Sequence, residues 1–140
     1  MRTKRIAALT LALLLCLALA ACGAGSGGGI WEGAKYTEDT ELGEGAGTIS
    51  FECTAEGRTV TFTIHTDAEF LRGALEENGL IAGDESEFGL YVKTVNGMTA
   101  DYDADGLYWS LYVGGEYATS GVDTTPVTDG GSYAFVCEEA

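Results

Sequence analysis

The sequence predicts an α+β fold: a small mixed β-sheet with one packed helix, in a β-grasp-like arrangement with the order β-β-α-β-β-β-β. Three observations favour this class. Apolar and polar residues alternate in several short runs after residue 47, which is typical of half-buried strands. One segment between these runs has apolar residues at helical spacing. Several of the 21 Gly residues of the 140-residue chain fall between the runs, where turns are expected.

The first two runs predict a β-hairpin. In residues 49–53 and 60–64, apolar side chains occupy every second position, so each run has one buried and one exposed face. The segment Ala55-Glu56-Gly57 between them has the composition of a tight turn. We therefore expect two antiparallel strands joined by a short loop.

A short amphipathic helix is predicted directly after the hairpin. Thr66 and Glu69 have the spacing of a capping box, in which the hydroxyl accepts from a first-turn N–H and the carboxylate reaches back. The apolar residues within 70–75 form one helical face, and the Asn78-Gly79 pair is a stop signal. We therefore expect this helix to pack across the sheet.

Four more strands are predicted in the rest of the domain. An acidic loop follows the helix, and the alternating runs after it predict strands at residues 90–95, 107–113, 116–118 and 133–137. The Gly114-Gly115 pair joins the second and third of these as a two-residue hairpin loop, because such loops need backbone angles that glycine tolerates.

Residues 1–21 are predicted to be a secretory signal peptide. Arg2, Lys4 and Arg5 give a charged start, and residues 6–21 form an apolar run, which together are typical of export signals. The alternative is a membrane-spanning helix. Such a helix needs about 20 apolar residues, and the run has sixteen, so export is the favoured interpretation.

The end of this run has the sequence Leu19-Ala20-Ala21-Cys22-Gly23, which resembles the lipobox of bacterial lipoproteins. The resemblance implies cleavage before Cys22 and attachment of acyl chains such as palmitate. Because each buried CH₂ contributes about 0.8 kcal/mol, several acyl chains anchor a protein firmly. We therefore expect a lipid-anchored protein at the extracytoplasmic face of the cell membrane.

Residues 22–47 are predicted to be a Gly-rich acidic tether, and residues 48–140 the folded domain. The tether has nine Gly and too little apolar surface to offset the entropy lost on ordering. Its two aromatic residues, Trp31 and Tyr36, are expected to dock on the domain.

The charge of the chain excludes one class of partner. Seven Lys and Arg against 22 Asp and Glu give a formal net charge of −15. No basic stripe is present to contact a phosphate backbone, so no nucleic-acid partner is expected. Removal of residues 1–21 takes away three basic residues and no acidic one, which leaves −18.

One part of the domain resembles a known family. The stretch Asp105–Tyr117, followed by Gly121-Val122-Asp123 and Asp129-Gly130, is similar to the C-terminal domain of transcobalamin and intrinsic factor. Its most specific motif is Trp-x-x-Tyr-Val-x-Gly-Glu, from Trp109 to Glu116. Bacterial relatives of that domain are lipoprotein domains of unknown function. The likeness covers residues 48–140 and implies a small β-rich fold, which in the vitamin carriers closes over a corrinoid, so cobalamin is one candidate ligand.

Cys53 and Cys137 are the two cysteines of the predicted domain. Both lie at the ends of predicted strands, on the apolar phase of the alternation. In an oxidising exterior an even pair of cysteines is typical of a disulfide, which would stabilise the domain by roughly 4–5 kcal/mol through loop closure. Two buried free thiols are the alternative.

Residues 101–106 spell Asp-x-Asp-x-Asp-Gly, the first half of an EF-hand calcium loop. Asp101, Asp103 and Asp105 are therefore candidate ligands for Ca²⁺. The twelfth position of the loop, normally Glu, is Tyr112, and a strand rather than a helix is predicted around it. An acidic turn is the favoured interpretation.

Tyrosines are concentrated in residues 91–117, which hold five of the seven. Tyr108 and Tyr112 are on the phase opposite to Trp109, so one sheet face is expected to present phenols outward. We expect Tyr108, Trp109, Tyr112 and Tyr117 to form a ligand-binding surface, because amphipathic aromatic residues are common in recognition. A face covered by the helix or tether is the alternative, and Trp109 is favoured as a core residue.

No catalytic residue is predicted. The single histidine, His65, lies on the polar phase of its strand, and neither a nucleophile elbow nor a metal-binding His pair accompanies it. We therefore expect a non-enzymatic extracytoplasmic binding module for a small molecule, an envelope polymer or a protein. A structural or adhesive interaction module is the alternative, and corrinoid binding is a third hypothesis.

Overall fold

The computed structural model of the chain describes residues 29–140. The predicted signal peptide and Cys22 lie outside the described residues, so both expectations stay predictions. Within residues 29–140, no helix is long and apolar enough to cross a membrane.

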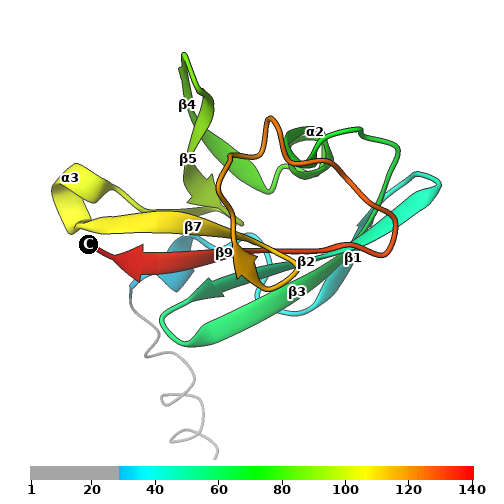
Figure 1. Cartoon of the computed structure of the whole chain (residues 1–140). Helices are drawn as coiled ribbons and strands as arrows, with labels where there is room; N and C mark the ends of the chain where they lie inside the picture. The colour runs from blue at the N-terminus through cyan, green and yellow to red at the C-terminus, as the bar shows by residue number, and fades with distance from the viewer. Residues whose placement is uncertain (1–28) are drawn as a thin grey trace, which may run out of the picture.

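A six-stranded mixed sheet forms the centre of the structure (Figure 1). Its strands lie in the order β1-β3-β2-β9-β7-β8. The pairs β1–β3 and β2–β9 are parallel, and the other pairs are antiparallel. The strand bounds are β1 (Thr40–Gly43), β2 (Gly47–Ala55), β3 (Arg58–Thr66), β7 (Leu107–Val113), β8 (Glu116–Tyr117) and β9 (Ser132–Glu139).

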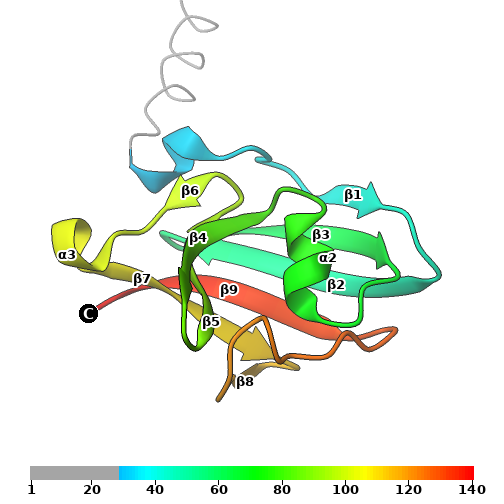
Figure 2. The same cartoon turned by 90° about the horizontal axis from the view of Figure 1, so that it is seen from above.

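A second sheet and three short helices complete the fold. The second sheet has the order β4-β5-β6, with β4 (Ile81–Ser86), β5 (Gly89–Val95) and β6 (Met98–Thr99). The helices are the 3-10 helix η1 (Ile30–Gly33) and the α-helices α2 (Leu71–Glu76) and α3 (Tyr102–Asp105). Figures 1 and 2 show α2 and the β4–β5 hairpin on the same face of the larger sheet.

The core lies between that face and α2. Phe51, Phe62 and Phe135 are each at most 3% exposed. The ring centroids of Phe51 and Phe62 lie 5.9 Å apart, and those of Phe51 and Phe135 lie 6.2 Å apart. Leu71 and Leu75 of α2 are fully buried. Burial of each such side chain contributes about 1.5–3 kcal/mol, so this layer is the main stabilising feature.

The predicted fold class is wrong. The chain is mostly β, with two sheets instead of one small sheet, and α2 and α3 have only six and four residues. The segment expected to be an acidic loop forms β4. This strand pairs with β5, and both belong to the second sheet. Five of the six side chains of β4 are exposed, so its sequence has no alternation to reveal the strand.

The predicted capping box is also wrong. Thr66 is the last residue of β3, and its hydroxyl donates to Glu77 at 2.6 Å and accepts from the Ala68 N–H at 3.0 Å. The helix begins at Leu71 instead. The loop before β9 supplies its first acceptors, since the Leu71 N–H donates to the Thr125 carbonyl oxygen at 2.8 Å.

The hairpin predictions hold. β2 and β3 pair along their whole length, with Phe51 opposite Phe62. At the β7–β8 turn, Gly114 and Gly115 have φ of 60° and 84°, the left-handed values that this loop type requires. The sequence therefore fixes the position of the strands on which the candidate surface is built.

Part of the segment expected to be a tether is folded onto the domain. β1 pairs with β3, and the Trp31 Nε1–H donates to the Ala55 carbonyl oxygen at 2.9 Å. The Tyr36 N–H donates to Asn96 Oδ1 at 3.0 Å, and the Asn96 side chain donates back to the Tyr36 carbonyl oxygen at 2.8 Å. Trp31 and Tyr36 thus dock as the sequence indicates.

Candidate functional site

Strand β7 has one partly open edge. On one side it pairs with β9 along its whole length. On the other side β8 covers only its end, through the pairs Tyr112–Tyr117 and Val113–Glu116. Among residues 29–140, no strand therefore pairs with residues 107–111 on that side.

Aromatic side chains surround a hollow of about 540 Å³ at this edge. They come from four separate elements, β5, α3, β7 and β8, which all lie within residues 89–117. The residues that line the hollow are Tyr91, Tyr102, Tyr108, Trp109, Tyr117 and Ala140. Tyr91, Tyr102 and Tyr117 are 49%, 55% and 64% exposed, so their phenols are available to a ligand. We call this feature the tyrosine hollow.

Trp109 forms the inner wall of the tyrosine hollow. It is 8% exposed, and its Nε1–H donates to the Lys93 carbonyl oxygen at 3.0 Å. The sequence indicates a core residue at this position, and the structure agrees. A smaller recess of about 200 Å³ shares Tyr91, Trp109 and Tyr117 with the hollow and is lined by β5, β7 and the segment that follows β8.

Tyr112 lies beside the hollow and contacts a carboxylate. Its hydroxyl donates to Glu138 Oε1 at 3.0 Å, and the Ser110 hydroxyl donates to Glu138 Oε2 at 2.6 Å. These hydrogen bonds hold the pKa of Glu138 below its ordinary value, and the one from Ser110 has the largest effect. The hydrogen bond to Glu138 in turn raises the pKa of Tyr112. Both phenol and carboxylate are thus fixed in one orientation.

The tyrosines also contact one another. The rings of Tyr112 and Tyr117 meet edge to face with centroids 5.7 Å apart, and those of Tyr102 and Tyr108 are tilted at 6.4 Å. Burial, followed by the nearby Glu138 carboxylate, raises the pKa of Tyr108. The ring contacts therefore hold four of the tyrosines in two packed pairs.

The predicted surface residues are brought together only in part. Tyr108, Trp109 and Tyr117 line the hollow, whereas Tyr112 does not line it and packs against the ring of Tyr117. Sequence reasoning did not assign Tyr91 or Tyr102 to the surface, although both belong to the tyrosine cluster. Glu138 was missed because its contact depends on the pairing of β7 with β9.

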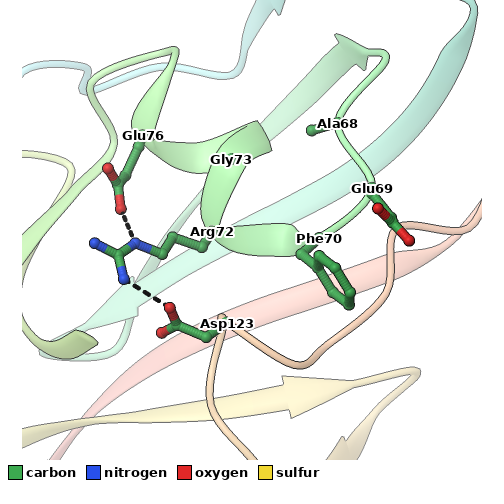
Figure 3. A pocket seen from close by; sticks show the side chains of 7 residues that line it. All are labelled: Ala68, Glu69, Phe70, Arg72, Gly73, Glu76 and Asp123. Atoms are coloured by element: carbon green, nitrogen blue, oxygen red, sulfur yellow. Dashed lines mark hydrogen bonds and ion pairs between the residues drawn. The ribbon is translucent and has the colours of Figure 1, made fainter. Parts of the chain in front are cut away.

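A second hollow, of about 390 Å³, lies beside α2 (Figure 3). Its only cation, Arg72, is already bound by three carboxylates: Glu76, Glu85 and Asp123, the last at 2.6 Å. The hydrogen bond from the Leu90 N–H, at 2.8 Å, is the main reason that the pKa of Asp123 is lowered. This network joins α2, β4 and the loop before β9, and is structural.

The acidic turn holds no metal cluster in the described part of the chain. No group of three or more metal-ligating side chains was found in residues 29–140. Asp101 is instead the N-cap of α3, and its carboxylate accepts from the Asp103 and Ala104 N–H groups at 3.0 and 3.2 Å. Asp103 and Asp105 are exposed. The three aspartates thus belong to the helical turn α3 and its N-cap, and not to the half calcium loop that their spacing suggests.

Cys53 and Cys137 are free in the structure. They lie on the neighbouring strands β2 and β9, where Cys53 is opposite Phe135, so Cys137 is offset by two residues. Strand spacing and rise place the two Cα atoms roughly 8 Å apart, beyond the range of about 4.4–6.8 Å in disulfides. Burial is the main cause that raises the pKa of Cys53 to about 12.

His65 lies away from the tyrosine hollow. Its Nδ1 is 3.1 Å from the Thr48 hydroxyl, and its Nε2 is 3.6 Å from Glu41. None of these three residues lines the hollow.

Comparisons with known proteins identify the family. A model described as a domain of unknown function, DUF4430, matches residues 68–133. A solved structure from Ruminococcus gnavus ATCC 29149 is 31% identical, with 68% of this chain and 99% of that chain covered and a TM-score of 0.64. The chain belongs to the DUF4430 family. Metal binding has been ascribed to that Ruminococcus protein.

The fold also resembles part of haptocorrin. Haptocorrin in complex with Cbi matches with a TM-score of 0.56 and 19% identity, over 66% of this chain and 25% of haptocorrin. This level of identity shows the fold alone. It confirms, at that level, the resemblance to the transcobalamin C-terminal domain. No curated protein matches the chain.

Proposed function

We propose that this DUF4430 protein is a non-enzymatic binding module at the extracytoplasmic face of the cell membrane, and that its ligand contacts the tyrosine hollow. One observation carries the proposal: five aromatic side chains from four separate elements converge on a single open hollow. Tyrosine and tryptophan supply large contact areas at low entropic cost, which is why they are enriched in recognition surfaces.

The residues around the hollow suit binding better than catalysis. The side chains that line it are phenols, an indole and a methyl group, which can stack, hydrogen-bond and exclude water. A nucleophile with an adjacent base, or a pair of acidic groups, is not among them. The hollow's volume of about 540 Å³ falls in the range of small-molecule sites.

Acyl chains on Cys22 are the proposed membrane anchor, with the resemblance of residues 19–23 to a lipobox as support. A structural or adhesive module remains the alternative. Corrinoid binding is the third candidate, and its support is the fold of haptocorrin, which was solved with Cbi. The metal binding ascribed to the Ruminococcus protein gives weaker support for a calcium ligand, because Asp101 already caps α3.

The test compares ligand binding by two variants of the full chain. The double variant Tyr91→Ala with Tyr117→Ala removes two exposed walls of the hollow. Phe88→Ala is the matched control, because Phe88 is 91% exposed and does not line the hollow. Calorimetric titration with cyanocobalamin, chitooligosaccharides and short peptides should find at least one probe whose affinity falls tenfold or more in the double variant only.

One result would overturn this proposal, and another would narrow the choice of ligand. Full affinity of the double variant for every bound probe would exclude the hollow as the contact surface. An unchanged visible spectrum of cyanocobalamin at micromolar protein would remove the corrinoid hypothesis alone. Thermal unfolding of each variant shows whether a loss of affinity reflects a loss of folding.

A further inference from the structure

We propose that the tyrosine hollow binds an extended, positively charged peptide, which adds to the open edge of β7 as a further strand. The inference rests on the proposed function and names the class of ligand. Three features of β7 support this peptide: the direction of its backbone groups, the room beside them and the charge around them.

The backbone groups of Leu107 and Trp109 point toward the open edge. The Leu111 carbonyl oxygen accepts from the Ala118 N–H at 2.9 Å on the β8 side, whereas the Gly114 N–H donates to the Ser132 carbonyl oxygen on the β9 side. Because backbone direction alternates along a strand, the odd-numbered residues of β7 face away from β9. In the described part of the chain, nothing bonds the backbone of Leu107 or Trp109 on that side.

The open edge has the length of a short strand. From Leu107 to Leu111, whose carbonyl oxygen already accepts from Ala118, it spans about 13 Å, at roughly 3.3 Å per residue. Tyr102 precedes it on α3, and Tyr117 follows it on β8. Side chains of an added strand would point alternately to the two faces of the sheet. One set would meet Tyr108, and the other would meet Tyr91.

This edge lacks the features that usually protect unpaired strands. Natural edges are blunted by Pro, Lys, bulges or a covering element. Residues 107–111 contain neither Pro nor Lys, and β7 pairs with β9 without a register shift. Main-chain hydrogen bonds to such an edge, with pockets for alternate side chains, are a recurring mode of peptide recognition.

The surroundings of the edge are acidic, which selects a cationic peptide. Asp84, Asp101 and Asp103 line a recess that shares Tyr91 and Tyr102 with the tyrosine hollow, and Glu116 precedes Tyr117 on β8. The one cation close by, Lys93, is paired with Asp84 at 2.8 Å. Residues 29–140 hold all 22 acidic residues and four basic ones. A second copy of this chain would therefore bring like charges together.

Amide hydrogen exchange of the full chain tests strand addition directly. The probe is the hexapeptide acetyl-(Lys-Val)₃-amide. Its binding should slow exchange of the Leu107 and Trp109 amides at least tenfold, because both gain hydrogen bonds. The Tyr108 and Ser110 amides, which face β9, are the internal control and should change little.

N-methylated peptides separate main-chain pairing from side-chain contact. One version carries methyl groups on the three Val nitrogens, and the other on the three Lys nitrogens. Since only alternate N–H groups of an added strand face β7, one version should lose at least tenfold in affinity and the other should retain it. In the protein, Leu107→Pro removes one donor of the open edge and should weaken binding, whereas Leu107→Ala keeps this donor.

The following outcomes would each overturn the proposed strand addition. Equal effects of the two methylation patterns would mean side-chain contact alone, and the proposed function would stand. Equal affinity for acetyl-(Glu-Val)₃-amide, or no binding of the lysine peptide, would exclude a cationic strand. Slow exchange at Trp109 in the free protein, together with dimers in sedimentation, would assign the edge to a second copy.

Discussion

Tyr112 and Glu138, on neighbouring strands of the larger sheet, are joined by a 3.0 Å hydrogen bond in which the phenol is the donor. The Ser110 hydroxyl occupies the other carboxylate oxygen at 2.6 Å. Charge-assisted hydrogen bonds of this kind are about twice as strong as neutral ones. The pair therefore fixes to β9 the ring of Tyr112, which packs edge to face against Tyr117 of the tyrosine hollow.

Glu138→Gln should lower the pKa of Tyr112 toward its ordinary value, because the hydrogen bond to Glu138 is the main cause of the raised pKa. Tyr108 should respond less, since burial is its main cause. Tyrosine Cζ NMR titration measures both values. An unchanged Tyr112 pKa would contradict the hydrogen bond.

The same substitution should alter the acid dependence of stability. The folded state holds the pKa of Glu138 below its ordinary value of 4.5. Ionised Glu138 therefore stabilises the folded state above pH 4.5, and this stabilisation is lost as the pH falls through the folded-state pKa. Between about pH 5 and pH 3, the melting temperature of the wild type should therefore fall more steeply than that of Glu138→Gln. Parallel curves would argue against this linkage.

Asn96→Ala should destabilise the protein by about 2–4 kcal/mol. Asn96 is fully buried, has φ of 51° and bonds both backbone groups of Tyr36. Alanine would leave the partly buried N–H and C=O of Tyr36 without these partners and would occupy a left-handed conformation. Urea unfolding gives the value, with the exposed Thr119→Ala as a control expected within about 0.5 kcal/mol. A loss below about 1 kcal/mol would mean that the segment around Tyr36 is held by other contacts.

Asp101→Ala should cost about 0.5–2 kcal/mol, the usual value of an N-cap. Asp103→Ala should cost less, because its exposed side chain caps nothing. Thermal melts with and without millimolar calcium distinguish a cap from a metal site. Stabilisation of the wild type by calcium, abolished by either substitution, would restore the calcium hypothesis.

Cys53 should resist alkylation in the folded protein. Burial raises its pKa to about 12, so almost none of it is thiolate near neutral pH, and the thiolate is the reactive form. Peptide mapping after iodoacetamide treatment should find Cys53 labelled only when the protein is unfolded, with no reductant needed. A linked pair of peptides containing Cys53 and Cys137 would reinstate the disulfide.

Cys22→Ala should move the protein from the membrane to the aqueous phase in detergent partitioning, because the proposed acyl chains need its sulfur. Cys16→Ala is the matched control, since Cys16 lies within the predicted signal peptide. Membrane retention of Cys22→Ala would instead favour an uncleaved apolar anchor. Mass spectrometry of the N-terminal peptide identifies the modification.

The strands with strict alternation could be predicted from the sequence. The fully buried residues of β2, β3 and β9 occupy one phase of each strand, and this constraint appears directly in residue type, whereas β7 is recognisable from its alternating residue types although Trp109, Ser110 and Leu111 are all buried. β4 and β1 could not be predicted in this way. β4 is exposed on nearly all positions, and β1 depends on β3, a partner about 22 residues away.

The candidate surface, too, could be predicted from the sequence only in part. Tyr108 and Tyr117 belong to adjoining strands of one hairpin, so local sequence was enough to group them. Tyr91 reaches the hollow only because β5 belongs to a second sheet above β7. The contact between Glu138 and Tyr112 depends on the register of β9, which local patterns do not determine.

The docking of η1 also sets how far this domain can reach. If acyl chains on Cys22 hold it, eight peptide units separate the anchor from Ile30. Whatever path they take, they span at most about 29 Å, whereas a body starting at Thr48 could stand about 94 Å away. The tyrosine hollow would then stay within this span plus the distance across the folded body, so its ligand would have to come close to the bilayer or be carried there.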